Sequence, residues 1–147
     1  MIVVDTSTLV NFLRGLATPG AQALRRLEEG GTPFGIPGVC CQELLQGARD
    51  EKEWRLLLAY LESQDILVPL DPLAAHVEAA RIVFECRRRG ITVRSSTDCL
   101  IAHIVLERDG ILLHEDEDFE RIKGVRPLRT VLESATTPRM SDTCPSS

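Results

Sequence analysis

Asp5 stands directly after three apolar residues, Ile2–Val4, whose pattern predicts a short buried strand. A carboxylate buried beside apolar residues is costly unless it is paired. No Lys or Arg precedes Arg14 in the sequence, so the N-terminal segment offers no cation of its own to pair with Asp5. A cation bound from solution would compensate this charge.

Three further acids could meet at the same edge of a parallel sheet, because ligands collect outside the carboxyl ends of the strands. Asp116 follows the apolar run 111–113 by three residues, and Asp118 is close to it in sequence. Asp98 lies three residues after Ser95, which is the capping-box spacing and places it in the first turn of a helix. Asp98 and Asp116 could also do no more than cap their helices, and this alternative stays open.

Glu43 interrupts a largely apolar helical stretch, 39–48, although an exposed helical face would also accommodate it. Clustered carboxylates repel one another, so some take up protons at neutral pH unless a metal ion neutralises them. Ligands that are all oxygen favour Mg²⁺ or Mn²⁺ over zinc, and magnesium prefers partners that include phosphate oxygens. The predicted chemistry is attack of water on a phosphodiester or phosphate ester.

Strands and helices alternate along the chain. Apolar runs predict strands, the last of them at VRPL, and amphipathic stretches predict helices between them. The strands are expected at 2–4, 33–37, 66–70, 111–113 and 125–128, and the helices at 11–15, 21–27, 39–48, 51–63, 71–90 and 95–110. This order indicates an α/β fold with a central, mostly parallel sheet and helices on both faces.

Length and composition predict one domain. The chain has 147 residues, is 44% hydrophobic and carries a net charge of −5, which gives no overall attraction to nucleic acid. We expect the domain to cover 1–132 and the Ser-, Thr- and Pro-rich segment 133–147 to be a disordered tail. The five cysteines form no CxxC motif, and neither a signal peptide nor a membrane-spanning run is present, so we expect a cytoplasmic protein with reduced thiols.

Four segments resemble, in order and approximate spacing, the PIN-domain ribonucleases, and most closely the VapC-type toxins of bacterial toxin–antitoxin pairs. They are DTSTL, QELLQG, STDCLIA and LLHEDEDF, and the resemblance covers residues 1–132. It implies a PIN-like three-layer fold. It also implies an acidic metal site formed by Asp5, Glu43, Asp98 and Asp116.

The resemblance assigns further roles near these acids. Asp118 matches the second acid of the terminal motif and is a candidate for ligand or water-positioning roles. Thr6 and Ser7 match small hydroxyl residues beside the first acid, where a hydrogen bond to a ligand carboxylate is expected. His114 stands where many relatives have Thr, and we interpret it as a strand-edge residue rather than a substrate contact.

The implied function is metal-dependent cleavage of transfer RNA or ribosomal RNA by a homodimer. A small antitoxin inhibits such proteins by placing its C-terminal segment, often with an Arg, in the acidic groove. Trp54 and Tyr60 are expected in the core or in the dimer interface. A polyanionic substrate needs cations near the acids, and the candidates for phosphate contact are Arg14, Arg87, Arg88, Arg89 and Arg94. The run 87–89 is also the usual basic end of a helix.

Other functions remain open at this point. A haloacid-dehalogenase phosphatase needs a second acid two residues after the first, where Ser7 stands, and both this family and the response-regulator receivers need a late lysine that neither Lys52 nor Lys123 matches well. A PIN domain that only binds nucleic acid or protein is the main alternative to an enzyme. A nuclease directed at DNA is another, because no motif here recognises a 2′-hydroxyl.

Overall fold

The structure, a computed structural model, describes residues 1–131. In this part of the chain four strands and seven helices alternate: β1 Ile2–Val4, α1 Thr6–Leu13, α2 Pro19–Glu29, β2 Phe34–Pro37, α3 Gly38–Gln46, α4 Glu51–Glu62, β3 Asp65–Leu67, α5 Pro72–Arg88, α6 Ser96–Glu107, β4 Ile111–Leu113 and α7 Glu117–Ile122. The sheet has the order β3-β2-β1-β4, and every pair in it is parallel.

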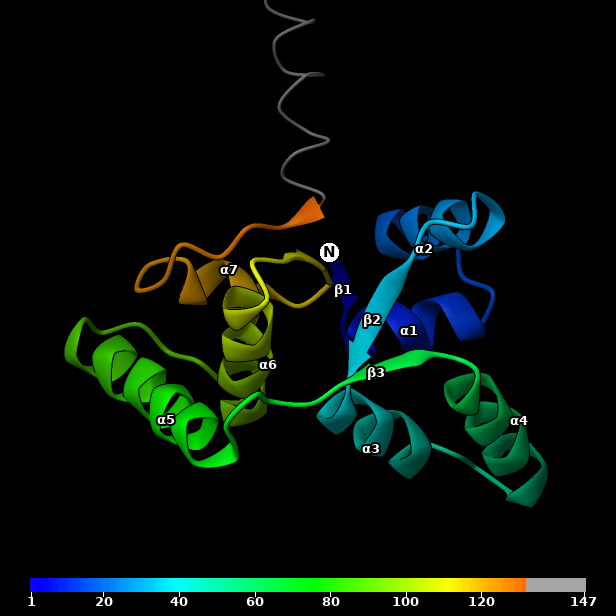
Figure 1. The fold of residues 1–147 in the computed structure, drawn as a ribbon, viewed down its shortest axis with the longest axis horizontal. Helices are drawn as coiled ribbons and strands as arrows, with labels where there is room; N and C mark the ends of the chain where they lie inside the picture. The colour runs from blue at the N-terminus through cyan, green and yellow to red at the C-terminus, as the bar shows by residue number, and fades with distance from the viewer. Residues whose placement is uncertain (132–147) are drawn as a thin grey trace, which may run out of the picture.

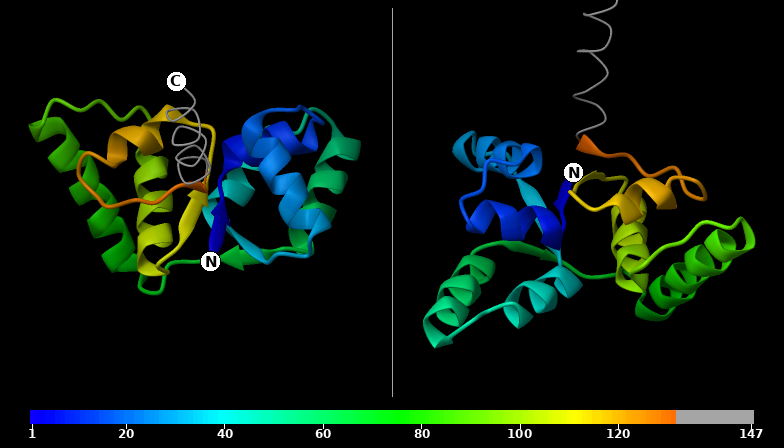
Figure 2. Two further views of the ribbon diagram at one scale, coloured as in Figure 1. Left: turned by 90° about the horizontal axis from the view of Figure 1, so that it is seen from above. Right: turned by 180° about the vertical axis from the view of Figure 1, so that it is seen from behind.

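Helices cover the sheet from both sides. Helices α5, α6 and α7 lie on one side, and α1, α2 and α4 lie on the other (Figures 1 and 2). This arrangement confirms the predicted α/β class with a central parallel sheet. Short, almost wholly apolar strands suit a parallel sheet, because both faces of such a sheet are buried.

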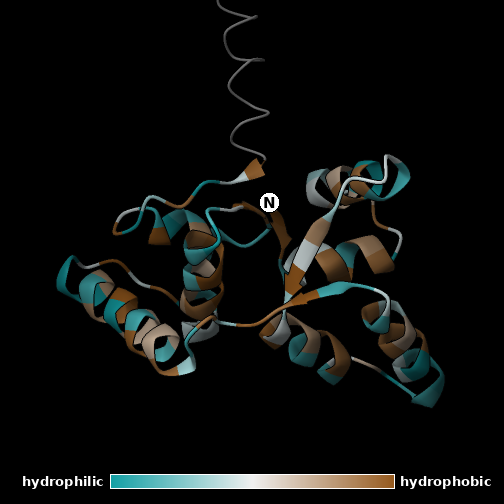
Figure 3. Ribbon diagram, in the orientation of Figure 1, coloured by the Kyte–Doolittle hydropathy of each residue, from teal (hydrophilic) through white to brown (hydrophobic). Residues whose placement is uncertain are grey.

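The core is centred on β1, β4 and α6. Val3, Val4, Leu112 and Leu113 are completely buried, and α6 buries side chains on several of its faces. Figure 3 shows that β1 is hydrophobic throughout, whereas α2 and α4 carry hydrophilic residues. Val4 pairs with Leu113 in the sheet register, so the chain leaves β1 and β4 at the same edge.

The first helix, predicted at 11–15, spans Thr6–Leu13 instead, and two predicted segments have a different secondary structure. No strand forms at 125–128 within the described residues; instead Thr130 makes an isolated bridge to Leu112, whose N–H donates to the Arg129 carbonyl over 2.9 Å. Pro127 has no amide hydrogen for a ladder, which explains why pairing begins only after it. The acidic segment that was predicted without secondary structure forms α7. The predicted tail lies outside the described residues.

Several local predictions are confirmed. Asp71 caps α5, Pro72 occupies its first position, and Arg87 and Arg88 lie in its last turn, which is the basic helix end predicted for the arginine run. Cys40, Cys41, Cys86 and Cys99 are free thiols, and Cys144 lies outside the described residues. None of the helices described here is both long and apolar enough to cross a membrane.

Candidate metal centre

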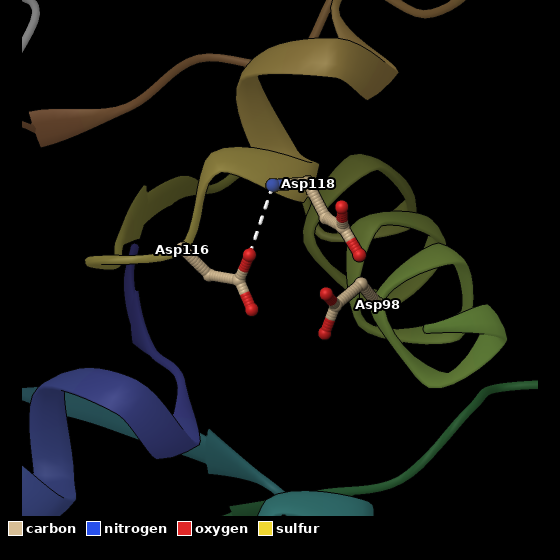
Figure 4. Close-up of side chains that lie close together, drawn as sticks. All are labelled: Asp98, Asp116 and Asp118. Carbon is tan, nitrogen blue, oxygen red and sulfur yellow. Dashed lines mark hydrogen bonds between the residues drawn. The ribbon is translucent and has the colours of Figure 1, made fainter. Parts of the chain in front are cut away.

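Three aspartates lie together at the edge of the sheet where β1 and β4 end. Asp98, in the first turn of α6, and Asp116 and Asp118, at the start of α7, each offer a carboxylate oxygen, and these oxygens lie within 4.8 Å of one another (Figure 4). Helix α6 packs against α7, which brings the two sequence segments together. The convergence of acids predicted from the strand ends is therefore present for these three residues.

Asp98 is the least satisfied member of the cluster. Its side chain is buried, and its Oδ2 has no hydrogen-bond partner. Burial, together with the nearby charges of Asp116, Asp118 and Asp5, raises the pKa of Asp98 to about 8. Ser95, not Asp98, occupies the N-cap position of α6, so the capping interpretation is wrong for Asp98.

Asp116 does cap its helix, as the capping interpretation predicted. Its Oδ1 accepts a hydrogen bond of 2.9 Å from the backbone N–H of Asp118. The other oxygen of Asp116 lies on the side of Asp98 (Figure 4). Capping therefore occupies one carboxylate oxygen and leaves the second for a ligand.

Asp118 is tied to the protein on both of its oxygens. Oδ2 accepts from the backbone N–H groups of Arg94 and Ser95, at 3.0 and 2.9 Å, and Oδ1 accepts from the Arg121 guanidinium at 2.9 Å. Burial acts to raise the pKa of Asp118, but these hydrogen bonds outweigh it and hold the pKa below its usual value. Asp118 therefore stays ionised and fastens α7 to the start of α6.

Asp5 lies next to this group but is not one of the three clustered acids. It is 3% exposed and caps α1 by accepting from the Thr8 N–H. The Ser7 hydroxyl lies 2.8 Å from each carboxylate oxygen of Asp5. Burial raises the pKa of Asp5 to about 6, although the bonds from Ser7 and Thr8 lower it. Its charge contributes to the raised pKa of Asp98.

Glu43 lies in α3 and contacts the residue that follows Asp5. Its Oε1 accepts a hydrogen bond of 2.7 Å from the Thr6 hydroxyl, and its side chain is half-buried. Glu43 is not among the three clustered acids, and it lines a cavity of about 550 Å³ between α1, α3 and α4 together with Arg14. Thr6 thus contacts Glu43, whereas Ser7 contacts Asp5.

A divalent cation fits this donor set. Asp98 has a buried carboxylate oxygen without a hydrogen-bond partner and lies next to two further carboxylates. The protein alone leaves this buried charge uncompensated at a cost in free energy, and a bound cation would neutralise it. The donors are all oxygen, which matches Mg²⁺ or Mn²⁺. Without a cation, the raised pKa values of Asp5 and Asp98 mean that protons reduce the repulsion instead.

The predicted arginines have different surroundings. Arg89 donates to the Gly124 carbonyl over 2.7 Å, which gives it a contact within the fold. The side chain of Arg94 is mostly exposed, and its Nε lies 3.8 Å from Asp118 Oδ1. Arg87 and Arg88 are exposed at the end of α5, and the Arg88 guanidinium lies over the Phe84 ring.

Two further residues around the site have contacts that the sequence pattern does not indicate. Glu115 accepts from the Thr18 hydroxyl at 2.5 Å, and its backbone N–H donates to the Ser7 hydroxyl at 2.9 Å, so it links α2, α1 and the loop after β4. His114 was predicted to be a simple strand-edge residue, but it is buried with both ring nitrogens hydrogen-bonded. Burial lowers the pKa of His114 below its usual value. No periodic pattern in the sequence marks either residue.

A family model of the PIN domain matches residues 2–125. This chain belongs to the PIN-domain family. It is 32% identical over 130 residues to the VapC ribonuclease Mb1587 of Mycobacterium bovis and equally to the ribonuclease VapC11 of Mycobacterium tuberculosis, covering 88% of this chain and 96% of each relative. The predicted resemblance to VapC-type PIN domains is confirmed, and the phosphatase and receiver alternatives are excluded.

Solved structures agree on the fold. VapBC2 from Rickettsia felis, bound to a DNA fragment from its promoter, has a TM-score of 0.68 at 15% identity, over 89% of this PIN domain chain and 98% of that chain. FitAcB from Neisseria gonorrhoeae has a TM-score of 0.66 at 18% identity, over 88% of this chain and 96% of that chain. At such identities the likeness concerns the fold.

Proposed function

We propose that this PIN domain is a metal-dependent endoribonuclease that cleaves transfer RNA or ribosomal RNA as the toxin of a toxin–antitoxin pair. Its cofactor is Mg²⁺, which Mn²⁺ can replace, and it acts in the cytoplasm, where these RNAs are found. The observation that carries the proposal is the buried, unpartnered Oδ2 of Asp98 beside Asp116 and Asp118. The relatives at 32% identity are ribonucleases, which supports the same function for this chain.

In this proposal the catalytic acids are Asp5, Glu43, Asp98 and Asp116, which hold the metal, and Asp118 contributes to the same site. The chemistry that Mg²⁺ supplies in such a site is activation of water for attack at phosphorus and stabilisation of the charge that develops on the phosphate. Asp5 and Asp98 have raised pKa values, so they release protons when the cation binds.

The neighbouring residues orient these carboxylates. Ser7 holds both oxygens of Asp5, and Thr6 holds one oxygen of Glu43. Asp118 is engaged by Arg94, Ser95 and Arg121 and has less freedom than Asp98 to turn toward a ligand. We therefore assign Asp118 mainly to holding the loop before α6 against α7.

RNA contact is assigned to arginines around the acids. Arg14 is exposed beside the cavity that Glu43 lines, and the exposed Arg94 side chain approaches Asp118, which supports phosphate contacts close to the cleavage site. Arg87 and Arg88 extend the basic surface at the end of α5, and Arg89 has the additional contact with Gly124. Replacing these residues should reduce the salt dependence of RNA binding.

The antitoxin partner is a small protein whose C-terminal segment occupies the acidic groove. Support comes from solved neighbours that are VapBC toxin–antitoxin complexes. The cavity that Glu43 lines adds support, because Leu13, Leu44 and Leu57 line it together with charged residues. An arginine of the partner would pair with carboxylates that hold no cation. Inhibition of cleavage by the protein from the neighbouring gene tests this assignment.

A homodimer is the proposed assembly. Helix α5 buries Ala75, Ala79 and Ile82, yet it also exposes the apolar side chains of Val77 and Phe84, and exposed apolar surface of this kind supports an interface. Trp54 is also exposed, which excludes the core for this residue and leaves the dimer interface as its predicted place.

Light scattering during size-exclusion chromatography tests the dimer. A Val77→Glu substitution should shift the mass toward the monomer, whereas His76→Glu, on a neighbouring exposed position, should leave it unchanged. A wild-type monomer at micromolar concentration would remove the homodimer from the proposal.

Cleavage of purified RNA tests the enzyme itself. Total transfer RNA and ribosomal RNA are incubated with the protein and Mg²⁺, Mn²⁺ or EDTA, beside Asp98→Asn and a control, Asp65→Asn. Asp65 is exposed at the amino end of β3, opposite the edge where the acids lie, so the control makes the same chemical change away from the site. We expect discrete fragments from the wild type and the control that disappear with EDTA and in Asp98→Asn.

Other outcomes decide between the remaining functions. If the wild type and the Asp65→Asn control bind RNA or a partner protein but cleave nothing, the domain is a binding module. Cleavage of DNA but not RNA under the same conditions would establish a DNA-directed nuclease. Fragments that persist in EDTA and in Asp98→Asn would show a nuclease activity from another source.

A further inference from the structure

His114 lies at the end of β4, two residues before Asp116, and its imidazole is enclosed by the protein. His114 is 8% exposed, and its ring packs against the ring of Phe119 with 4.9 Å between the ring centroids. Since Phe119 is completely buried in α7, this contact fixes the plane of the imidazole against the helix that follows Asp116.

Both ring nitrogens of His114 have partners. Nδ1 accepts a hydrogen bond of 3.1 Å from the backbone N–H of Asp116, and Nε2 lies 2.9 Å from Glu120 Oε2. Because Nδ1 is an acceptor, the proton of the neutral ring must be on Nε2, where it donates to Glu120. Lys123 binds the other oxygen of Glu120 at 2.9 Å and so holds that carboxylate in place.

The bond to Asp116 restrains a backbone position next to a proposed metal ligand. Asp116 is held twice: its N–H donates to His114, and its Oδ1 accepts from the Asp118 N–H. These two bonds fix the backbone and one carboxylate oxygen of Asp116. They therefore also fix the direction of its second oxygen, which lies on the side of Asp98 (Figure 4). Without the first bond, the loop between β4 and α7 would lose one of these two restraints.

We propose that His114 is a positioning residue that orients Asp116 through the hydrogen bond from the Asp116 N–H to Nδ1, with Glu120 selecting the tautomer. This inference rests on the proposed function, in which Asp116 binds the metal. His114 does not contact the RNA in this role, because its ring is buried and both nitrogens are already engaged. A simple strand-edge residue would need neither bond.

A pair of substitutions with almost the same shape isolates the acceptor. Thr can accept from the backbone N–H two residues ahead through its hydroxyl, whereas Val has no acceptor. His114→Thr and His114→Val both lose the contact with Phe119 and the bond to Glu120, so their losses of Tm should be similar. Only His114→Thr keeps a partner for the Asp116 N–H.

Mn²⁺ binding to protein stripped with EDTA is measured by calorimetry for the wild type and both variants. We expect His114→Val to weaken Mn²⁺ affinity about fivefold to tenfold and His114→Thr to restore most of the loss, in keeping with the effect of residues that orient metal ligands. RNA cleavage at subsaturating Mn²⁺ should follow the same order. Equal Mn²⁺ affinities in the two variants, with the wild type binding normally, would overturn the positioning role alone.

Wild-type protein that binds no Mn²⁺ would instead overturn the proposed metal site, and the role of His114 with it.

A spectroscopic measurement checks the hydrogen bond between Asp116 and His114 directly and does not depend on metal or RNA. In ¹⁵N-labelled protein we expect a scalar coupling across the hydrogen bond between the Asp116 amide nitrogen and His114 Nδ1, and a protonated Nε2. A ring protonated on Nδ1 would overturn the proposal.

Discussion

Thr6 and Glu43 are joined by a hydrogen bond of 2.7 Å between the Thr6 hydroxyl and Glu43 Oε1. The residue that follows Asp5 therefore orients an acid from α3, and the next residue, Ser7, orients Asp5 itself. The first turn of α1 thus connects β1, α3 and the site by hydroxyl groups.

Removing the Thr6 hydroxyl should impair the enzyme without unfolding it. We expect Thr6→Val to lower kcat/KM for RNA cleavage about fivefold, because a hydrogen bond to a carboxylate of this kind contributes on the order of 1 kcal/mol. Thr6→Ser, which retains the hydroxyl, should keep most of the activity. Steady-state kinetics on a short RNA substrate makes the comparison, and a Thr6→Val enzyme as active as the wild type would contradict it.

The Ser7 hydroxyl should set the pH range over which Asp5 is available to a metal. Its hydrogen bonds lower the pKa of Asp5 and partly offset burial, which leaves the pKa raised to about 6. In Ser7→Ala the pKa of Asp5 should rise further, so Mn²⁺ affinity near pH 6.5 should fall about fivefold, with a smaller difference at pH 8.5. Calorimetric titrations at several pH values measure this.

The matched control for Ser7→Ala is Ser63→Ala, at the exposed end of α4. It removes the same hydroxyl far from Asp5 and should not change the pH dependence. The same pH profile for Ser7→Ala and the wild type would show that this bond does not govern Asp5.

Asp98 should make the metal-free protein less stable as pH rises. Its pKa is raised from 3.8 to about 8, so between these values the folded protein binds more protons than the unfolded chain. The contribution of Asp98 is therefore fully present below about pH 4 and is lost as pH rises through about 8. In EDTA, Asp98→Asn should be more stable than the wild type at pH 8 by roughly 1–3 kcal/mol.

Urea unfolding in EDTA from pH 5 to 8.5 measures this difference. At pH 5 the two proteins should differ much less, because Asp98 is then protonated. Parallel stability curves over the whole range would contradict the raised pKa. Adding Mn²⁺ should stabilise the wild type and leave Asp98→Asn nearly unchanged.

Asp116 and Asp118 should differ in what they contribute, although both lie in the cluster. Asn caps a helix as well as Asp does, so Asp116→Asn should change the free energy of unfolding by less than about 0.5 kcal/mol while cleavage falls at least about 100-fold. Asp118→Asn replaces an acceptor oxygen that Arg94, Ser95 or Arg121 requires, and it should cost about 2–4 kcal/mol. Chemical unfolding and cleavage assays compare them, and equal losses of stability would refute the distinction.

The sequence predicted the four strands of the sheet and the edge where the acids lie, together with a fifth strand at 125–128 that the described residues do not form. The apolar runs of β1, β2 and β4 are short and almost uninterrupted, which is typical of strands buried on both faces. Because parallel strands end at one edge, the position of Asp5 and of the segment after β4 followed from the same pattern. Helix α7 was missed because it has six residues, three of them acidic, and only Phe119 and Ile122 as buried apolar side chains.

The environment of each acid could not be predicted from local sequence. Ser95 has the right spacing to make Asp98 a helix-capping partner, yet the packing of α6 against α7 buries Asp98 instead. Likewise, the bonds from Arg94 and Ser95 to Asp118 join residues more than twenty positions apart. These features depend on contacts between helices, and no periodicity within one helix encodes them.

The pairing of β4 with β1 has a consequence for synthesis of the protein. Asp98 precedes β4 in the chain, whereas Asp116 and Asp118 follow it, so a ribosome-bound fragment that stops before β4 has no assembled carboxylate cluster. On the proposed function, the nascent chain is inert toward the RNA of its own ribosome until β4 and α7 have emerged. On the same function, toxic activity therefore requires the completed fold.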